Sequence, residues 1–209
     1  MKYVIIDTDF FRFITKDLKE DKLLINAMNE LGYMPVLHEF VYKHELHEDP
    51  FIKNLIDRKL LMVLNYSLFK NDKRFISEYE RLFKMAFYEM NGTKFDDDKK
   101  FTDYHHEKQN LGEIHSVVLA RLQDMDIFMS NDKGAKFFVE NKLNTAKNKI
   151  SVVDIEETFT KLITPSSNSI KWKDVRSIIS IWKNSNPTDE KKYKHIRQCW
   201  VKDVTEDKE

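Results

Sequence analysis

The chain has 209 residues, which can bury one full-sized core but seldom two, so we expect one domain with a small C-terminal extension. Lys plus Arg and Asp plus Glu both number 35, and the zero net charge excludes a general electrostatic attraction to nucleic acid or acidic lipid. Any polyanion must therefore be bound at a local site. Cys199 is the only cysteine, which excludes an intrachain disulfide and cysteine-rich zinc modules and is consistent with a reducing compartment.

The apolar segments are short. The N-terminus, MKYVIIDTDFF, has the pattern of a strand rather than of an apolar leader. The other apolar runs are far shorter than the roughly 18 residues that a membrane span needs. We therefore expect a cytoplasmic protein without a membrane partner.

Strands and helices are expected to alternate along most of the chain. In chain order we expect a strand at 3–6, helices at 17–31, from Pro35 and from Pro50, a strand at 60–64, a helix at 72–91, a loop at 96–110, a helix from Gly112, a strand at 126–129, a helix from Lys133, a strand at 150–155, a helix from Glu156 and further helices over 170–202. This alternation is typical of an α/β fold with a parallel sheet and helices on both faces. The polar stretch TPSSNS at 164–169 is predicted to be a linker between a domain at 1–163 and an extension at 164–209.

Local signals set the bounds of several helices. Asp17 followed by Glu20 is a capping signal for the first helix. Pro35 suits the first turn of PVLHEFVYKHEL, because its missing N–H would have no partner there. Large apolar side chains recur at helical spacing from residue 72 onward, and Gly92 is placed to end that run.

Four carboxylates from distant parts of the sequence are expected to meet at one edge of the sheet. Ligands of an open parallel sheet bind at the carboxyl ends of its strands, where helix N-termini also converge. Asp7 and Asp132 each follow a predicted strand, whereas Glu113 and Glu39 lie in early turns of predicted helices. Close carboxylates raise one another's pKa values, so such a cluster is stable only with a cation among them. Oxygen-only ligands select Mg²⁺ or Mn²⁺, which can polarise a phosphoryl oxygen and generate hydroxide for in-line attack.

Four segments in this order resemble the signature blocks of the PIN-domain nucleases: YVIIDTDFF, PVLHEF, LGEIHSVVLA and FMSNDKGAK. The resemblance covers about residues 1–160 and implies a PIN-like three-layer fold that hydrolyses phosphodiesters, mostly in RNA. Many members are toxins of bacterial toxin-antitoxin pairs, so it also implies an antitoxin as a protein partner, while a homo-oligomer stays open. Carried over by position, the catalytic and metal-binding residues would be Asp7, Glu39, Glu113 and Asp132, with Mg²⁺ or Mn²⁺ as the cofactor.

The first and last blocks depart from the family pattern. Asp9 stands where the first block usually has asparagine, and we expect it to support the metal ligands through hydrogen bonds, although direct ligation stays open. Ser130 and Asn131 precede Asp132 and are expected to play the same supporting role. The last block often has a second acid, which is missing here. One tightly bound metal is therefore expected, with a second arriving only with substrate.

Three basic or polar side chains are candidates for contact with phosphate: Lys133, Lys136 and His115. The choice of Glu39 is ambiguous, because Glu45 and Glu48 follow it. Glu45 lies nearly two turns further on, so on a straight helix it would point elsewhere.

Each acid also has a purely local interpretation. Asp7 could end a strand and cap a turn, Asp132 could be the N-cap of the next helix, and Glu113 could complement a helix dipole. The order of the four acids favours a shared site. His105, His106 and His115 near Glu113 suggest zinc, but they lack a recognised spacing and are expected to be solvated or hydrogen-bonded. The run Asp96–Asp98 is expected to be a solvated turn.

Residues 171–202 are rich in basic and aromatic side chains. The nine basic residues are Lys171, Lys173, Arg176, Lys183, Lys191, Lys192, Lys194, Arg197 and Lys202. With Trp172, Trp182, Tyr193 and Trp200 among them, this surface could hold phosphates and stack unpaired bases. Alternatively, Ile178 and its apolar neighbours pack the segment onto the domain and leave an ordinary solvated face. The third interpretation is that this segment binds a partner protein such as an antitoxin.

Two other functions compete with the nuclease. IIDTDFF and SND resemble parts of the haloacid dehalogenase-like phosphatases, in which the first aspartate attacks phosphorus. That pattern expects a small residue where Phe11 stands and leaves Glu39 and Glu113 without a role. The other alternative is a non-catalytic PIN-like nucleic-acid-binding module whose metal site has decayed.

Overall fold

The alternation of side chains along the first strand divides the hydrophobic core into two parts. Val4 and Ile6 pack on one face of the central sheet, and Ile5 packs on the other. All three are fully buried, so helices must cover both faces. This computed structural model describes residues 2–69, 71–101, 104, 110–163, 169–185 and 190–206.

The sheet has five strands, all parallel, in the order β3-β2-β1-β4-β5. The strands are β1 (Lys2–Ile6), β2 (Tyr33–His38), β3 (Met62–Leu64), β4 (Ile127–Met129) and β5 (Ser151–Val153). The predicted parallel sheet flanked by helices is thereby confirmed. The chain winds from β1 to one side through β2 and β3 and then returns to the other side with β4. The topological switch point therefore lies between the carboxyl ends of β1 and β4.

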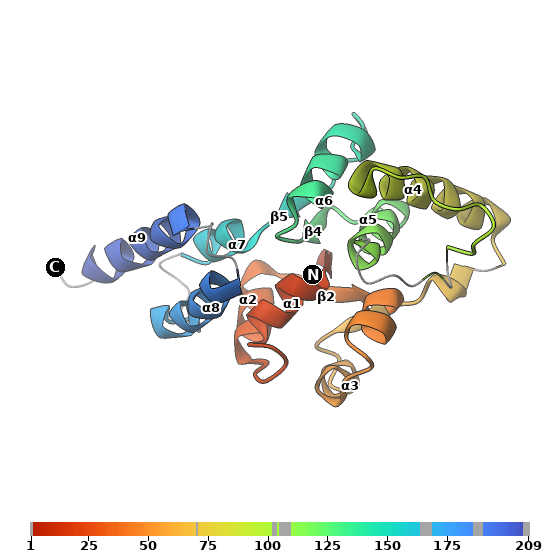
Figure 1. The fold of residues 1–209 in the computed structure, drawn as a ribbon. Coiled ribbons are helices and arrows are strands. Elements are labelled where there is room, and N and C mark those ends of the chain that lie inside the picture. The colour runs from red at the N-terminus through yellow and green to blue at the C-terminus, as the bar shows by residue number, and fades with distance from the viewer. Residues whose placement is uncertain are drawn as a thin grey trace.

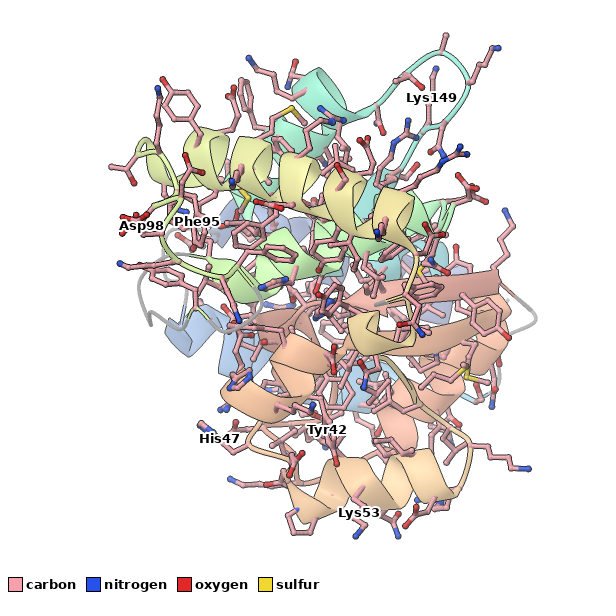
Figure 2. All side chains as sticks on the ribbon, turned by 90° about the vertical axis from the view of Figure 1, so that its right-hand side faces the viewer. Tyr42, His47, Lys53, Phe95, Asp98 and Lys149 are labelled. Atoms are coloured by element: carbon pink, nitrogen blue, oxygen red, sulfur yellow. The ribbon has the colours of Figure 1, made fainter. Side chains whose placement is uncertain are left out.

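Helices form a layer on each face of the sheet (Figure 1). One face is covered by α1 (Thr8–Ile14), α2 (Lys22–Leu31), α3 (Pro50–Asp57), α7 (Ile155–Lys161), α8 (Trp172–Ser185) and α9 (Glu190–Glu206), and the other by α4 (Lys73–Asn91), α5 (Leu111–Leu122) and α6 (Lys133–Phe138). Three short irregular helices complete the described chain: η1 (Val41–Glu45), η2 (Tyr66–Phe69) and η3 (Val139–Leu143). Figure 2 shows the sheet between α4 above and α3, which carries Lys53, below.

The first predicted helix, at 17–31, is wrong in its N-terminal bound, and a helix before it was missed. The helix expected from Asp17 begins only at Lys22, because residues 16–18 have positive φ angles and form a turn. The segment before this turn is instead helix α1, which the sequence reading missed. Its short apolar run, FFRFI, was too brief to show a clear helical period.

The segment from Pro35 is a strand and not the start of a helix. Residues 33–38 form β2, in which Pro35 lies opposite Val4 of β1. Because β3 pairs with β2 only from Val36 onward, one side of the strand has no neighbour at the proline, and its missing N–H breaks no ladder there. Burial of this strand on both faces therefore overrides the preference of proline for a helix start.

The helices after residue 169 belong to the same core as the sheet. Val175, Ile178 and Trp182 of α8 are almost fully buried in the cluster that covers one face of the sheet. Trp200 of α9 is also buried, and its Nε1–H donates to the carbonyl oxygen of Phe159 over 3.1 Å. The apolar packing expected for 170–202 is thus present, whereas residues 164–168 of the expected linker lie outside the described residues.

Within the described ranges, no helix combines the length and the apolar composition that crossing a membrane requires.

Candidate functional site

Two of the predicted acids lie at the topological switch point. Asp7 directly follows β1, and its N–H donates to the carbonyl oxygen of Met129 at the end of β4 over 3.1 Å. Its Oδ1 accepts the N–H of Phe10 at 2.7 Å, so it caps α1. Asp132 follows β4 and caps α6 by accepting the N–H of Ala135 at 2.5 Å. Both local capping roles are therefore present, at the edge of the sheet where ligands of this architecture bind.

Ser130 links these two aspartates. Its Oγ accepts the N–H of Asp132 at 3.0 Å, and its hydroxyl is hydrogen-bonded to the Asp7 carboxylate. The serine is 1% exposed, so this bridge is shielded from water. Asn131 turns the other way, because its Oδ1 accepts the N–H of Ile155 at 3.1 Å and ties the end of β4 to α7. Ser130 thus supports the acids as expected, whereas Asn131 supports the neighbouring helix.

The structure does not bring Glu39 to this group of acids. Its carboxylate pairs with Lys43 at 3.3 Å. Its charge also acts on the Tyr79 hydroxyl, whose pKa is raised strongly by burial and further by Glu39. The glutamate that reaches the switch point is Glu45, whose charge raises the pKa of Glu113. Glu45, rather than Glu39, therefore belongs to this group of acids in the structure, whereas a metal-ligand role of Glu39 stays a prediction.

Backbone geometry explains why Glu45 faces the site. The strand runs to His38, and the following segment closes one wide helical turn, in which the N–H of Leu46 donates to the carbonyl oxygen of Val41 over 2.9 Å. Glu39 and Glu45 consequently project from different sides of the turn. The sequence signal for this arrangement was the strand-like run VLH, followed by the apolar residues Val41 and Leu46 on either side of the polar run KHE.

Two hydrogen-bond donors hold the Glu45 carboxylate. Thr8 donates its hydroxyl, and the N–H of Gly112 at the start of α5 provides a second hydrogen bond. Gly112 also leaves the space that this carboxylate occupies, because a Cβ atom on residue 112 would overlap it. Burial raises the pKa of Glu45, and the Thr8 and Gly112 donors lower it. The sequence reading used Gly112 only as a helix start and missed this contact.

Gly112→Ala is expected to displace Glu45 and so to reduce any stabilisation of the fold by Mn²⁺, the cation that the sequence predicts for these acids. The added methyl group would overlap the carboxylate, while alanine is otherwise favourable in a helix. The measurement is the shift of the thermal midpoint with Mn²⁺, which should be as small as in Glu45→Gln. In Gly112→Ala/Glu45→Asp the shorter acid makes room for the methyl group, so part of the shift should return. An unchanged shift in Gly112→Ala would contradict this packing argument.

The carboxyl groups at the switch point repel one another. Burial raises the pKa of Asp7 well above its usual value, and the charge of Glu113 raises it further. Burial also raises the pKa of Glu113 from 4.5 to about 7. Further charges that add to the shift of Glu113 come from Glu45, Asp132 and Asp9. Five carboxylates from four separate segments therefore interact electrostatically, whereas the sequence predicted four acids as metal ligands.

Arg12 on α1 is the cation that offsets part of this charge within the described chain. Burial raises the pKa of Asp9, the Arg12 guanidinium lowers it, and the charge of Asp132 raises it again. Arg12 is itself held in place, since Nη2 donates to the carbonyl oxygen of Glu45 at 3.3 Å and Nη1 pairs with Asp17 at 3.3 Å. One guanidinium faces five acids, and part of the repulsion among them is relieved by protonation, since the pKa values of Asp7 and Glu113 are raised.

A cavity of about 460 Å³ gives solvent access to part of the cluster. Asp9, Glu45 and Glu113 line it together with Thr8 and Arg12. Its rim includes His47, which extends outward from the turn after η1 (Figure 2). A ligand in this cavity would therefore meet three carboxylates and one guanidinium.

The predicted phosphate contact of His115 is wrong, because this residue is buried at 3% exposure. The N–H of Phe40 donates to Nδ1 of His38 at 2.9 Å, so Nε2 of His38 carries the hydrogen and donates to the Tyr79 oxygen at 2.9 Å. The Tyr79 hydroxyl oxygen also lies 2.9 Å from Nδ1 of His115, within hydrogen-bond distance, and 3.3 Å from the His115 carbonyl oxygen, to which the hydroxyl can donate. Burial lowers the pKa of His38 to about 3, which agrees with a neutral ring. His115 therefore joins α5 to α4 and β2 behind the site.

Lys133 and Lys136, the other predicted phosphate contacts, lie in different surroundings. Lys133 is exposed at the start of α6, whereas Lys136 pairs with Glu157 of α7 at 3.2 Å. His105 and His106 lie outside the described residues. The Asp96 carboxylate accepts the N–H of Asp98 at 3.1 Å, as expected for a solvated turn.

The acidic cluster suits a hard divalent cation in its chemistry. Its ligands are all carboxylate oxygens, and a cation would relieve the repulsion that raises their pKa values. Among the residues that the structure describes, however, no three His, Cys, Asp or Glu side chains are arranged as a metal-binding group. Ligation of Mg²⁺ or Mn²⁺ thus requires these side chains to move closer together.

Comparison of the chain with models of known protein families found no match. Searches for similar curated proteins and for similar solved structures also found none. The resemblance to PIN-domain nucleases therefore rests on the four sequence segments alone.

Proposed function

We propose that the chain is a metal-dependent endoribonuclease with a PIN-like fold. The observation that carries this proposal is the convergence of five carboxylates from four segments at the switch point of a parallel sheet. Asp7, Glu45, Glu113 and Asp132 are the proposed metal ligands, with Asp9 beside them. The resemblance further supports a cytoplasmic toxin with an antitoxin partner.

The protein groups around the acids would orient them for this reaction. A bound Mg²⁺ or Mn²⁺ would polarise the scissile phosphate and lower the pKa of an attacking water. Ser130 would orient Asp7, and Thr8 and Gly112 would orient Glu45, so the side chains would have to move closer around a metal from positions that are already defined. Without metal, the pKa of about 7 leaves the Glu113 carboxyl protonated about half of the time at neutral pH, and cation binding would release that proton.

Asp7→Asn and Asp132→Asn are each expected to lower Mn²⁺-dependent cleavage of RNA strongly. The loss should exceed the roughly 10–100-fold that follows removal of a residue that only hydrogen-bonds to a metal ligand. Each change keeps the shape of the side chain but removes one negative charge from the cluster. The assay follows single-stranded and structured RNA by gel, with Asp57→Asn on α3 as the matched control. Full activity in both variants would contradict the proposed chemistry.

A non-catalytic nucleic-acid-binding module is the second candidate. It is favoured by the lack of a preformed metal-binding group among the described residues. Binding of RNA by a native chain that cleaves no nucleic acid, with Mn²⁺ supplied, would support this candidate.

A further inference from the structure

A second cavity, of about 510 Å³, lies between α8 and α9. Its volume falls within the roughly 300–1,000 Å³ of ligand pockets, and its lining shares no residue with the acidic cavity. Trp172, Arg176 and Lys183 line it from α8, and Lys194 and Arg197 line it from α9. We call it the α8–α9 groove.

The α8–α9 groove carries an excess of positive charge. Glu190 is the acid in its lining, and it pairs with Lys194 at 3.1 Å. Within the described chain, the ion pairs of α8 and α9 do not include Arg176, Lys183 or Arg197. All three are exposed and line the groove, and the Lys183 charge, after that of Lys194, lowers the pKa of Glu190. Arg176 and Arg197 thus add positive charge that the described ion pairs do not offset. Such an arrangement attracts an anion with several charges.

An aromatic ring lies beside these cations on a fixed support. Trp172 is half-buried, and its ring packs on that of Trp200 at a centroid distance of 6.5 Å and an angle of 30°. Trp200 is itself anchored by its hydrogen bond to Phe159. Buried Ile179 and Tyr193 form the apolar part of the lining. The groove thus offers a rigid aromatic surface next to phosphate-binding cations.

We propose that the α8–α9 groove binds single-stranded RNA, with phosphates on Arg176 and Arg197 and an unpaired base stacked on Trp172. Cations combined with a stacking ring are the recognition chemistry of unpaired nucleic acid. The choice of RNA rests on the proposed nuclease function. That function needs such a surface, because the acidic cluster repels a polyanion and the chain as a whole has no net charge.

The test measures binding of a labelled single-stranded RNA by fluorescence anisotropy in EDTA, where cleavage cannot occur. Arg176→Ser/Arg197→Ser is expected to bind at least about tenfold more weakly near 0.1 M salt. Its salt slope should fall by about 1.4, at about 0.7 per phosphate contact. The matched control is Lys53→Ser/Lys59→Asn, which removes two exposed lysines on α3 and just after it, and should stay within twofold of the native chain. Figure 1 shows α3 well apart from α9, and Figure 2 shows Lys53 at the outer side of α3.

Stacking is tested separately from charge. An abasic oligomer of equal length should bind about 5- to 150-fold more weakly, because a stacked base contributes about 1–3 kcal/mol. RNA should also quench the tryptophan fluorescence of the native chain, and Trp172→Phe should lose this quenching because Trp182 and Trp200 are buried.

Native-like binding by the arginine variant would overturn the proposal. Competition by polyglutamate of equal charge is the second outcome that would overturn it. If polyglutamate displaces the labelled RNA as effectively as unlabelled RNA does, the groove binds acidic protein rather than RNA. Because these assays contain no metal, they test the groove alone. RNA binding in EDTA by a native chain that cleaves no RNA once Mn²⁺ is supplied would refute the nuclease and leave the groove intact.

Discussion

Glu45→Gln is expected to abolish RNA cleavage, whereas Glu39→Gln is expected to leave it within about twofold of the native rate. Both changes replace a glutamate by its neutral isostere, and the two residues lie six positions apart in the same segment. Glu45 is held by Thr8 and Gly112 and raises the pKa of Glu113, so its charge acts at the proposed metal site. Glu39 pairs with Lys43, and its charge acts on Tyr79 instead.

The measurement is the initial rate of Mn²⁺-dependent cleavage for the two variants at equal concentration. Removing a metal ligand should lower the rate by more than the roughly 10–100-fold that follows removal of a residue that only hydrogen-bonds to a ligand. The cleavage rate of Glu45→Gln should therefore fall to background. Circular dichroism checks that both variants fold. A reversed order, with Glu39→Gln inactive and Glu45→Gln active, would restore the assignment made from the sequence.

The stability of the metal-free chain should fall as the pH rises from 5 to 8, relative to Glu113→Gln. The pKa of Glu113 is raised from 4.5 to about 7 by burial and by neighbouring acids, so between these values the folded state binds a proton that the unfolded state has lost. The free energy of unfolding therefore decreases with pH across this window, by up to about 3 kcal/mol. Asp7, Asp9 and Glu45 also have raised pKa values and act in the same direction.

Urea unfolding in EDTA at several pH values measures this effect. The comparison with Glu113→Gln is needed because His38, with a pKa lowered to about 3, makes stability rise with pH up to about 6.5 and is present in both chains. Mn²⁺ should restore stability more at pH 8 than at pH 5, since it binds the ionised acids. Parallel pH profiles for the two chains would show that Glu113 does not hold the additional proton.

The sequence was a good guide where a single element could be recognised from its own period or caps. The long helix that ends at Gly92 and the strands at 126–129 and 150–155 were predicted close to their observed bounds. Asp7 and Asp132 were placed correctly at strand ends, because the parallel topology follows from the alternation of elements.

The errors arose where tertiary contacts decide the local structure. Pro35 was taken as a helix start, because nothing in the sequence shows that this residue lies opposite Val4 in a buried strand. That mistake shifted the following helix, and so Glu39 was chosen in place of Glu45. His115 is close in sequence to Glu113, but its hydrogen bond to Tyr79 depends on the packing of two distant helices. No spacing rule within one segment could have revealed either arrangement.

The wide turn between Val41 and Leu46 makes the position of Glu45 depend on the number of residues before it. Its hydrogen bond spans five residues rather than the four of an ordinary helix. Deleting one residue from this turn would let it tighten into a regular helix and rotate Glu45 by about 100° away from Thr8. A deletion that leaves every proposed ligand in the chain would therefore take one of them out of the site, so the spacing of this segment is as much a functional requirement as its side chains.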